Sequence, residues 1–211
     1  MKRTSAADIT WMYDTLAATI SPQSDLQFKT PFELLVAVVL SAQATDKSVN
    51  IATNKLFPVA NTPATIAALG EEGLIPYIRT IGLFRTKAKN VIALCRLLIE
   101  HHAGEVPSTR TELEALPGVG RKTANVVLNV AFGQPTIAVD THVHRVANRL
   151  GICRSTTPEA TEQALLKRTP EQHLLHAHHY LILHGRYTCT ARAPQCATCV
   201  ISARCPSRLG A

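Results

Sequence analysis

Residues 111–133 read TELEALPGVGRKTANVVLNVAFG and set the pattern for the centre of the chain. A short apolar segment ends in Leu-Pro, the tripeptide GVG follows at residues 118–120, and a second amphipathic segment runs from Arg121 to Gly133. Two glycines around one apolar residue let the backbone turn tightly and approach a partner closely. The amides that open the second helix can bind an anion. The stretch therefore predicts two helices joined by a phosphate-binding hairpin, with a plain helix–helix turn as the alternative.

The rest of the chain also shows the apolar period of amphipathic helices. Thr30 fits an N-cap with Pro31 in the first helical position, and the apolar run after them predicts a buried central helix. Gly70 is expected to close a later helix, and four histidines between residues 173 and 179 are expected on a partly exposed helix face. Further helices are predicted over residues 8–20, 47–57, 62–69, 85–102, 141–150, 158–167 and 170–184. No segment alternates as a strand does, so the predicted class is all-α.

Composition limits where the protein works and what it binds. The 211 residues carry a formal net charge of +7, and residues 186–211 hold four arginines and no acid. Such a balance favours a polyanion, with acidic membranes, acidic proteins and a plain basic tail as alternatives. The most apolar run, residues 34–44, is too short to cross a bilayer. The N-terminus lacks the apolar region of a secretory signal, so we expect a cytoplasmic protein.

Four of the six cysteines lie close together near the C-terminus. Cys189, Cys196, Cys199 and Cys205 follow the spacing C-x6-C-x2-C-x5-C, whereas the other two occur in apolar, helix-like surroundings typical of core residues. In a reduced compartment, clustered thiols indicate a metal site rather than disulfides. Zinc and iron–sulfur both fit four thiolates, although zinc ribbons usually pair two C-x2-C units and this segment has one.

Two charged residues near the hairpin are candidates for catalysis. Lys122 lies in the first turn of the second helix, where the macrodipole opposes a positive charge and favours the neutral amine, the nucleophilic form. A simple phosphate contact is the alternative for this lysine. Asp140 in the sequence VDTHV fits an N-cap, and its second carboxylate oxygen could still face a neighbouring amine.

Several of these segments together resemble the endonuclease III family, whose members are DNA glycosylases with apurinic/apyrimidinic lyase activity. LPGVGRKTANVVLN, VDTHV, TPFELLVAVVLSAQATD and the four-cysteine spacing carry the resemblance, which runs from about residue 28 to 205. It implies two helical domains with a DNA-binding cleft between them. Residues 24–134 would form a six-helix domain that includes the helix-hairpin-helix at about 111–133. Residues 1–23 and 135–211 would form an iron–sulfur cluster domain.

The resemblance also assigns roles to particular residues. It makes Lys122 the Schiff-base nucleophile and Asp140 the catalytic carboxylate, and it makes the four clustered cysteines the ligands of a 4Fe–4S cluster. A flipped base leaves a hole in the duplex, and the resemblance places a filling side chain at Gln43 and an apolar wedge at Leu83. An ordinary core leucine is the alternative for Leu83. The hairpin residues expected to contact DNA are Gly118, Val119, Gly120 and Arg121.

The function implied is base excision repair by a monomer associated with the nucleoid. The substrate would be double-stranded DNA with an oxidised pyrimidine or an abasic site, cleaved by β-elimination. A mismatch adenine glycosylase of the same superfamily is one alternative, against which Lys122 and the end at Ala211 both count. A pyrimidine-dimer glycosylase and a non-catalytic helix-hairpin-helix protein that only binds DNA are the others.

One segment departs from the family pattern. Relatives often carry several basic residues between the first two cysteines, whereas residues 190–195 here hold Arg192 as their only charge. We expect Arg192 to supply most of the electrostatic contact of this loop with DNA, helped by Arg186 outside it. The alternative is that the loop makes no DNA contact and that the hairpin surface carries binding.

Overall fold

The computed structural model describes residues 3–22 and 24–209, and within them the secondary structure is helical, with no strand. This confirms the predicted all-α class. The chain divides into two compact units, residues 24–133 and residues 1–23 with 134–211. In the described part of the chain, none of the helices combines the length and the apolar character needed to span a bilayer.

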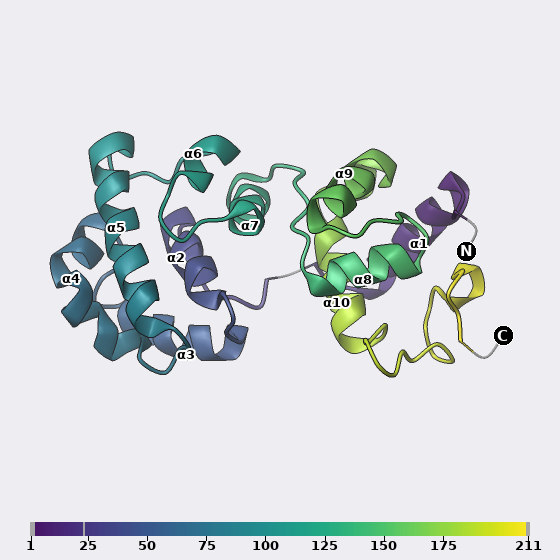
Figure 1. The fold of residues 1–211 in the computed structure, drawn as a ribbon, viewed down its shortest axis with the longest axis horizontal. Coiled ribbons are helices and arrows are strands. Elements are labelled where there is room, and N and C mark those ends of the chain that lie inside the picture. Colours follow the sequence, from purple (N-terminus) through teal and green to yellow (C-terminus); the bar gives the residue numbers. More distant parts are fainter. Residues whose placement is uncertain (1–2, 23, 210–211) are drawn as a thin grey trace. The chain divides into compact units, whose positions relative to one another are not determined.

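The unit of residues 24–133 is built around one buried helix. Every residue of α2 from Phe32 to Leu40 is buried, and α3, α5 and α7 pack around it (Figure 1). The central helix predicted from the sequence is therefore confirmed. The helices of this unit are α2 (Pro31–Ser41), α3 (Asp46–Leu56), α4 (Pro63–Ile78), α5 (Phe84–His102), α6 (Arg110–Glu114) and α7 (Arg121–Phe132).

Local signals set where the helices of this unit begin, and one predicted end is wrong. The Thr30 hydroxyl accepts a hydrogen bond from the Glu33 amide at 3.1 Å, which confirms the predicted N-cap. Helix α4, by contrast, does not end at Gly70. The backbone kinks there, with φ of 64°, and the helix resumes because Leu74 and Ile78 are buried in the same core.

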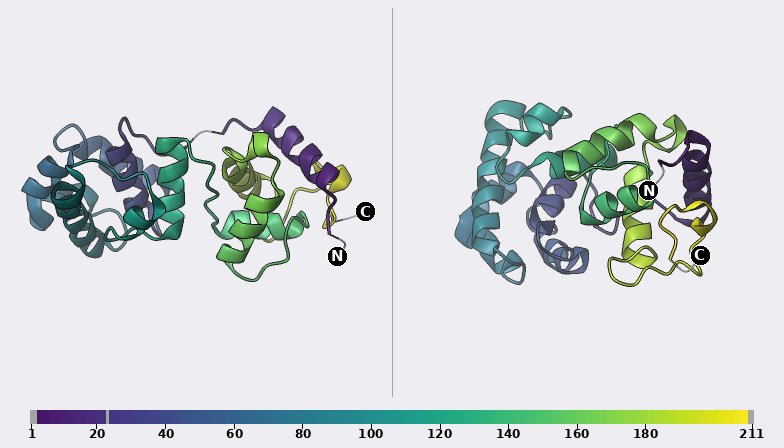
Figure 2. Two further views of the ribbon diagram at one scale, coloured as in Figure 1. Left: turned by 90° about the horizontal axis from the view of Figure 1, so that it is seen from above. Right: turned by 45° about the vertical axis from the view of Figure 1, so that its right-hand side comes forward.

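The second unit packs its N-terminal helix against segments from the C-terminal part of the chain. Its helices are α1 (Ala6–Thr19), α8 (Thr141–Arg149), α9 (Pro158–Arg168) and α10 (Ala177–Tyr187), with 3-10 turns at Glu171–His173 and Ser202–Arg204. Figure 2 shows α1 beside the C-terminal segment. The guanidinium of Arg204 lies 4.7 Å from the centre of the Trp11 ring and 3.2 Å from a carboxylate oxygen of Asp8.

The helix predicted over residues 170–184 is interrupted. A 3-10 turn and further turns precede α10. Of the four histidines, His176 and His179 are partly exposed as predicted, whereas His173 and His178 are buried. The reason lies in α1, which supplies partners for a buried imidazole. His173 Nε2 lies 2.7 Å from a carboxylate oxygen of Asp14, and its ring stacks on Tyr13 at 5.7 Å.

Helices α8 and α10 pack closely against each other at Gly185. A Cβ atom at this position would lie 3.0 Å from both the Cβ of His142 and a methyl carbon of Val146. We therefore expect Gly185→Ala to lower the free energy of unfolding by about 1–3 kcal/mol, because helix backbone must move to make room. Urea unfolding followed by circular dichroism measures this change. An unchanged midpoint would contradict the close packing.

Candidate functional site

The hairpin between α6 and α7 is fixed to the core by its apolar residues. Leu113, Leu116 and Val119 are buried, and the Val119 amide donates to the Leu116 carbonyl at 3.1 Å. The glycines on either side of Val119 are exposed. The predicted pair of helices joined by a tight hairpin is therefore confirmed, and the hairpin presents its backbone at the surface while the buried Val119 side chain anchors its centre.

The two glycines of the hairpin serve different purposes. Gly118 has φ of 79°, and a Cβ there would lie 3.2 Å from Asn90 and 3.3 Å from Val39. Its backbone conformation therefore favours glycine strongly, and its tight packing adds to that preference. Gly120 has an ordinary φ of −98°, and a Cβ there would have no neighbour within 4 Å. Its missing side chain leaves open the approach to the start of α7.

The start of α7 has the features of an anion site. Gly120 occupies the N-cap position without a side chain to accept from the first-turn amides. Two cationic residues, Arg121 and Lys122, lie in that same turn, and Lys122 is exposed. First-turn amides without a side-chain cap, the positive end of the helix dipole and these cations all favour a bound anion such as a phosphate.

Asp140 begins α8 in the second unit. Its Oδ1 accepts a hydrogen bond from the Val143 amide at 2.8 Å, so the predicted N-cap is confirmed. The residue is half-buried and follows the buried segment Thr136–Val139. Because the cap uses Oδ1, the carboxylate is held in a fixed orientation and its other oxygen keeps its acceptor capacity.

Gln43 and Leu83 both occur in strained turns of the first unit. Their φ angles are 55° and 59°, in the left-handed region that residues other than glycine and asparagine rarely adopt. The Leu83 side chain is 60% exposed, which excludes the alternative of a core leucine. The two turns are neighbours, since a Cβ added to Gly82 would lie 3.9 Å from the Gln43 carbonyl oxygen.

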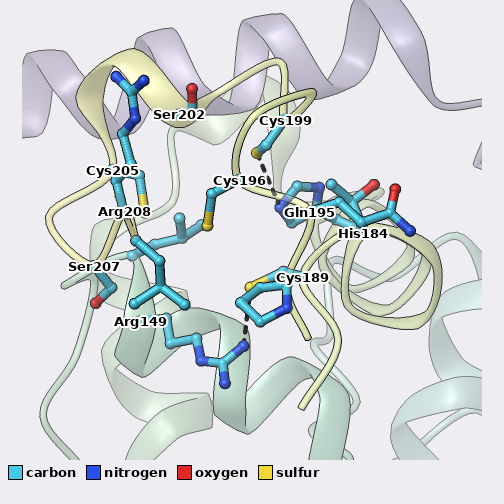
Figure 3. A pocket seen from close by; sticks show the side chains of 14 residues that line it. Arg149, His184, Cys189, Gln195, Cys196, Cys199, Ser202, Cys205, Ser207 and Arg208 are labelled. Atoms are coloured by element: carbon cyan, nitrogen blue, oxygen red, sulfur yellow. Dashed lines mark hydrogen bonds between the residues drawn. The ribbon is translucent and has the colours of Figure 1, made fainter. Parts of the chain in front are cut away.

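The four clustered cysteines line one cavity of about 190 Å³ in the second unit (Figure 3). Burial raises the pKa of the Cys199 and Cys205 thiols above the ordinary value. In residues 3–22 and 24–209, no three Cys, His, Asp or Glu side chains close around a single point as the ligands of one ion do. The four thiols instead lie on the wall of the cavity.

Two arginines and a histidine that sequence reasoning missed lie around these cysteines. Arg145 donates to the Cys189 carbonyl at 3.1 Å and to the Gly185 carbonyl at 2.8 Å. Arg149 donates to the Thr190 carbonyl at 2.7 Å and lies 3.5 Å from the Cys189 sulfur. The spacing of four residues places both arginines on one face of α8, but nothing local in the sequence indicates their partners.

His184 is the third of these missed residues. Its Nε2 lies 3.9 Å from the Cys199 sulfur, and burial lowers the pKa of the imidazole to about 4. The ring is therefore neutral at physiological pH and lines the cavity without adding positive charge.

Arg192 lies in the segment between the first two cysteines, and its side chain is exposed. The backbone just before it is fixed, since Arg149 donates to the carbonyls of Thr190 and Ala191 at 2.7 and 2.8 Å. Arg192 therefore projects from a segment whose main chain is held in place.

Comparison with known proteins places the chain among DNA repair enzymes. The family model of the HhH-GPD superfamily base excision DNA repair proteins matches residues 36–171. Endonuclease III of Escherichia coli strain K12 is 60% identical, and that of Haemophilus influenzae is 61% identical, each alignment covering 87% of both chains. A solved structure of a trapped endonuclease III–DNA covalent intermediate superposes with a TM-score of 0.90 at 47% identity, covering 96% of each chain.

The hairpin glycines provide a matched pair of variants. We expect Gly118→Ala to lower the free energy of unfolding by about 1–3 kcal/mol, because it adds both backbone strain and a clash. Gly120→Ala should cost less than about 1 kcal/mol, since its φ is ordinary and its surroundings are open. Urea unfolding of both variants without ligand measures the difference. Equal losses would contradict the separate roles of the two glycines.

Proposed function

The chain belongs to the endonuclease III family of HhH-GPD base excision DNA repair proteins, and we propose that it excises oxidised pyrimidines from duplex DNA. Members of this family are DNA glycosylases with abasic-site lyase activity. The observation that carries the proposal for this chain is the position of Lys122. This exposed lysine lies in the first turn of α7, a helix that starts directly after Gly120 and has no side-chain cap. An enzyme with this substrate works on the nucleoid.

The hairpin binds the DNA backbone in this proposal. A phosphate oxygen accepts hydrogen bonds from the first amides of α7, and the open side of Gly120 lets it come close. Such contacts position the enzyme without reading sequence, which suits an enzyme that must find damage anywhere. Arg121 adds charge at this surface, and Arg192 adds charge from the cysteine segment of the other unit.

Base extrusion precedes the chemistry, because C1′ and the glycosidic bond are shielded within a stacked duplex. Leu83 is the wedge and Gln43 the filling side chain. The exposure of both residues and the left-handed turns that carry them support these roles. Inserted groups of this kind offset part of the few kcal/mol that unstacking costs.

Lys122 then acts as the nucleophile. Its neutral amine attacks C1′, the glycosidic bond breaks, and the base leaves with the bonding electron pair and is protonated. Ring opening gives an imine between Lys122 and C1′, and protonation of this imine acidifies C2′. Loss of a C2′ proton then expels the 3′-phosphate by β-elimination. Asp140, oriented by its cap bond to Val143, stabilises positive charge at the sugar and takes part in the proton transfers.

The four thiols fit a 4Fe–4S cluster. Cys189, Cys196, Cys199 and Cys205 supply the four thiolates that such a cluster takes, and they line a cavity instead of closing on one point. A cluster with four protein ligands keeps no position open for substrate, so its contribution is to order the C-terminal segment. Arg145 and Arg149 donate to the carbonyls of Cys189 and Thr190 and so also help to hold that segment.

We expect a monomer to suffice, because one chain supplies both the amine and the carboxylate. A protein that only binds DNA would share the hairpin but would form no imine. Trapping with borohydride on abasic DNA therefore separates the two functions, since reduction makes the imine a stable covalent bond.

Lys122→Gln should abolish both borohydride trapping and strand cleavage on an abasic duplex. Without the amine no imine forms, and we expect cleavage to fall by on the order of 10³-fold or more. Affinity for the duplex should stay near that of the wild type, because the hairpin amides remain. Lys55→Gln, at an exposed lysine in the last turn of α3, is the control and should trap normally. Cleavage by Lys122→Gln at the wild-type rate would show that another group is the nucleophile.

Cys199→Ser should remove one cluster ligand. We expect wild-type protein purified without oxygen to carry about four iron atoms per chain, and the variant to lose most of its iron and its brown absorption. Cys95→Ala is the control, because this buried thiol lies in the core of the other unit and should leave the iron content unchanged. Wild-type protein that binds zinc and no iron would contradict the cluster.

A further inference from the structure

Lys87 is a buried lysine that the chemistry above does not use. It lies in α5, and only 5% of the residue is exposed. Its ammonium donates a buried hydrogen bond to the carbonyl of Leu40 at 2.9 Å. Lysine is almost never buried this completely unless it is paired, and burial lowers its pKa. The cost of burial indicates that this contact has a specific purpose.

The contact joins the turns at Gln43 and Leu83, two of the three described non-glycine positions with a positive φ; the third, Ala103, ends α5. Leu40 lies in the last turn of α2, three residues before Gln43. The Lys87 amide donates to the Leu83 carbonyl at 3.0 Å. Lys87 is thus bound through its backbone to the residue proposed as the wedge and through its side chain to the helix end that carries Gln43. The two turns also touch at Gly82 and the Gln43 carbonyl.

Helix electrostatics explain why a lysine suits this position. The last carbonyls of a helix lack amide donors from the next turn, and the C-terminal end carries partial negative charge. An ammonium placed there donates to a carbonyl and is attracted by the negative end of the helix dipole. It therefore fixes the end of α2 immediately before the chain enters the left-handed conformation at Gln43, which the surroundings must hold in place.

We propose that Lys87 is a positioning residue for base extrusion, which holds the Gln43 and Leu83 turns at a fixed separation so that both enter the duplex together. The proposal rests on the wedge and filling roles of those two residues in the proposed function. A lysine that only stabilises the core would affect every activity of the enzyme equally. A positioning lysine would instead affect the steps that require extrusion of a stacked, paired base.

Lys87→Met keeps the length of the stem and removes the ammonium. Single-turnover excision of an oxidised pyrimidine paired with adenine should fall by on the order of 10- to 100-fold, because displacement of the inserting groups by about 1 Å costs that much. Single-turnover cleavage of a preformed abasic site, which has no base left to extrude, should stay near the wild-type rate. Rates are normalised to the fraction of enzyme that borohydride can trap.

A second measurement follows insertion directly. A duplex with a stable tetrahydrofuran abasic analogue opposite 2-aminopurine becomes more fluorescent when the aminopurine is unstacked. Wild-type enzyme should raise this fluorescence at saturation, and Lys87→Met should raise it less. Lys89→Met removes a charge from an exposed position of the same helix and should behave as the wild type. If the methionine variant fails to fold, Lys87→Gln, whose side chain is polar but too short to reach Leu40, replaces it with the same expectations.

Excision and cleavage that fall together, or a fluorescence response equal to that of the wild type, would overturn the positioning role. Leu83→Ala in the wild-type background tests the underlying function separately. If it leaves excision and fluorescence unchanged, the wedge role is wrong and the proposal for Lys87 fails with it. If Leu83→Ala reduces both while Lys87→Met reduces neither, the wedge role stands and only the Lys87 proposal fails.

Discussion

Backbone amides at helix starts need acceptors, and this requirement organises the site. Seven helices, α1 to α4, α6, α8 and α9, begin with a Ser, Thr or Asp side chain that accepts from the first turn. Helices α5, α7 and α10 begin at Leu83, Gly120 and His176 without such a cap. The starts of α5 and α7 coincide with the proposed wedge and phosphate site, where a ligand can supply the acceptor that a capping side chain does not.

Helix α8 shows how one element can serve two purposes without conflict. Asp140 caps its first turn through Oδ1, while Arg145 and Arg149 on its later turns bind carbonyls of the cysteine segment. Each contact satisfies backbone groups that would otherwise lack partners. The helix is therefore fixed at both ends, and the carboxylate at its start has little freedom to reorient.

How far the sequence predicts this structure depends on the distance between partners along the chain. Thr30 and Asp140 bond to amides three residues away, so their caps were predictable. Arg149 and Lys87 bond to carbonyls 41 and 47 residues away, and no local pattern indicates such partners. The helix end predicted at Gly70 is wrong for the same reason. The core that receives the second half of α4 is assembled from other helices.

At the turns of Gln43 and Leu83, stability would favour other residue types than those that the proposed function requires. Glycine or asparagine would adopt the left-handed conformation at Gln43 and Leu83 with less strain, and a polar residue would suit the 60% exposed position of Leu83 better. Stability alone would therefore select neither residue. Such departures from local preference are expected at functional sites, where a side chain is kept for its contact with a ligand. An exposed leucine on a rigid turn suits insertion between bases, because its apolar surface leaves water only when the duplex covers it.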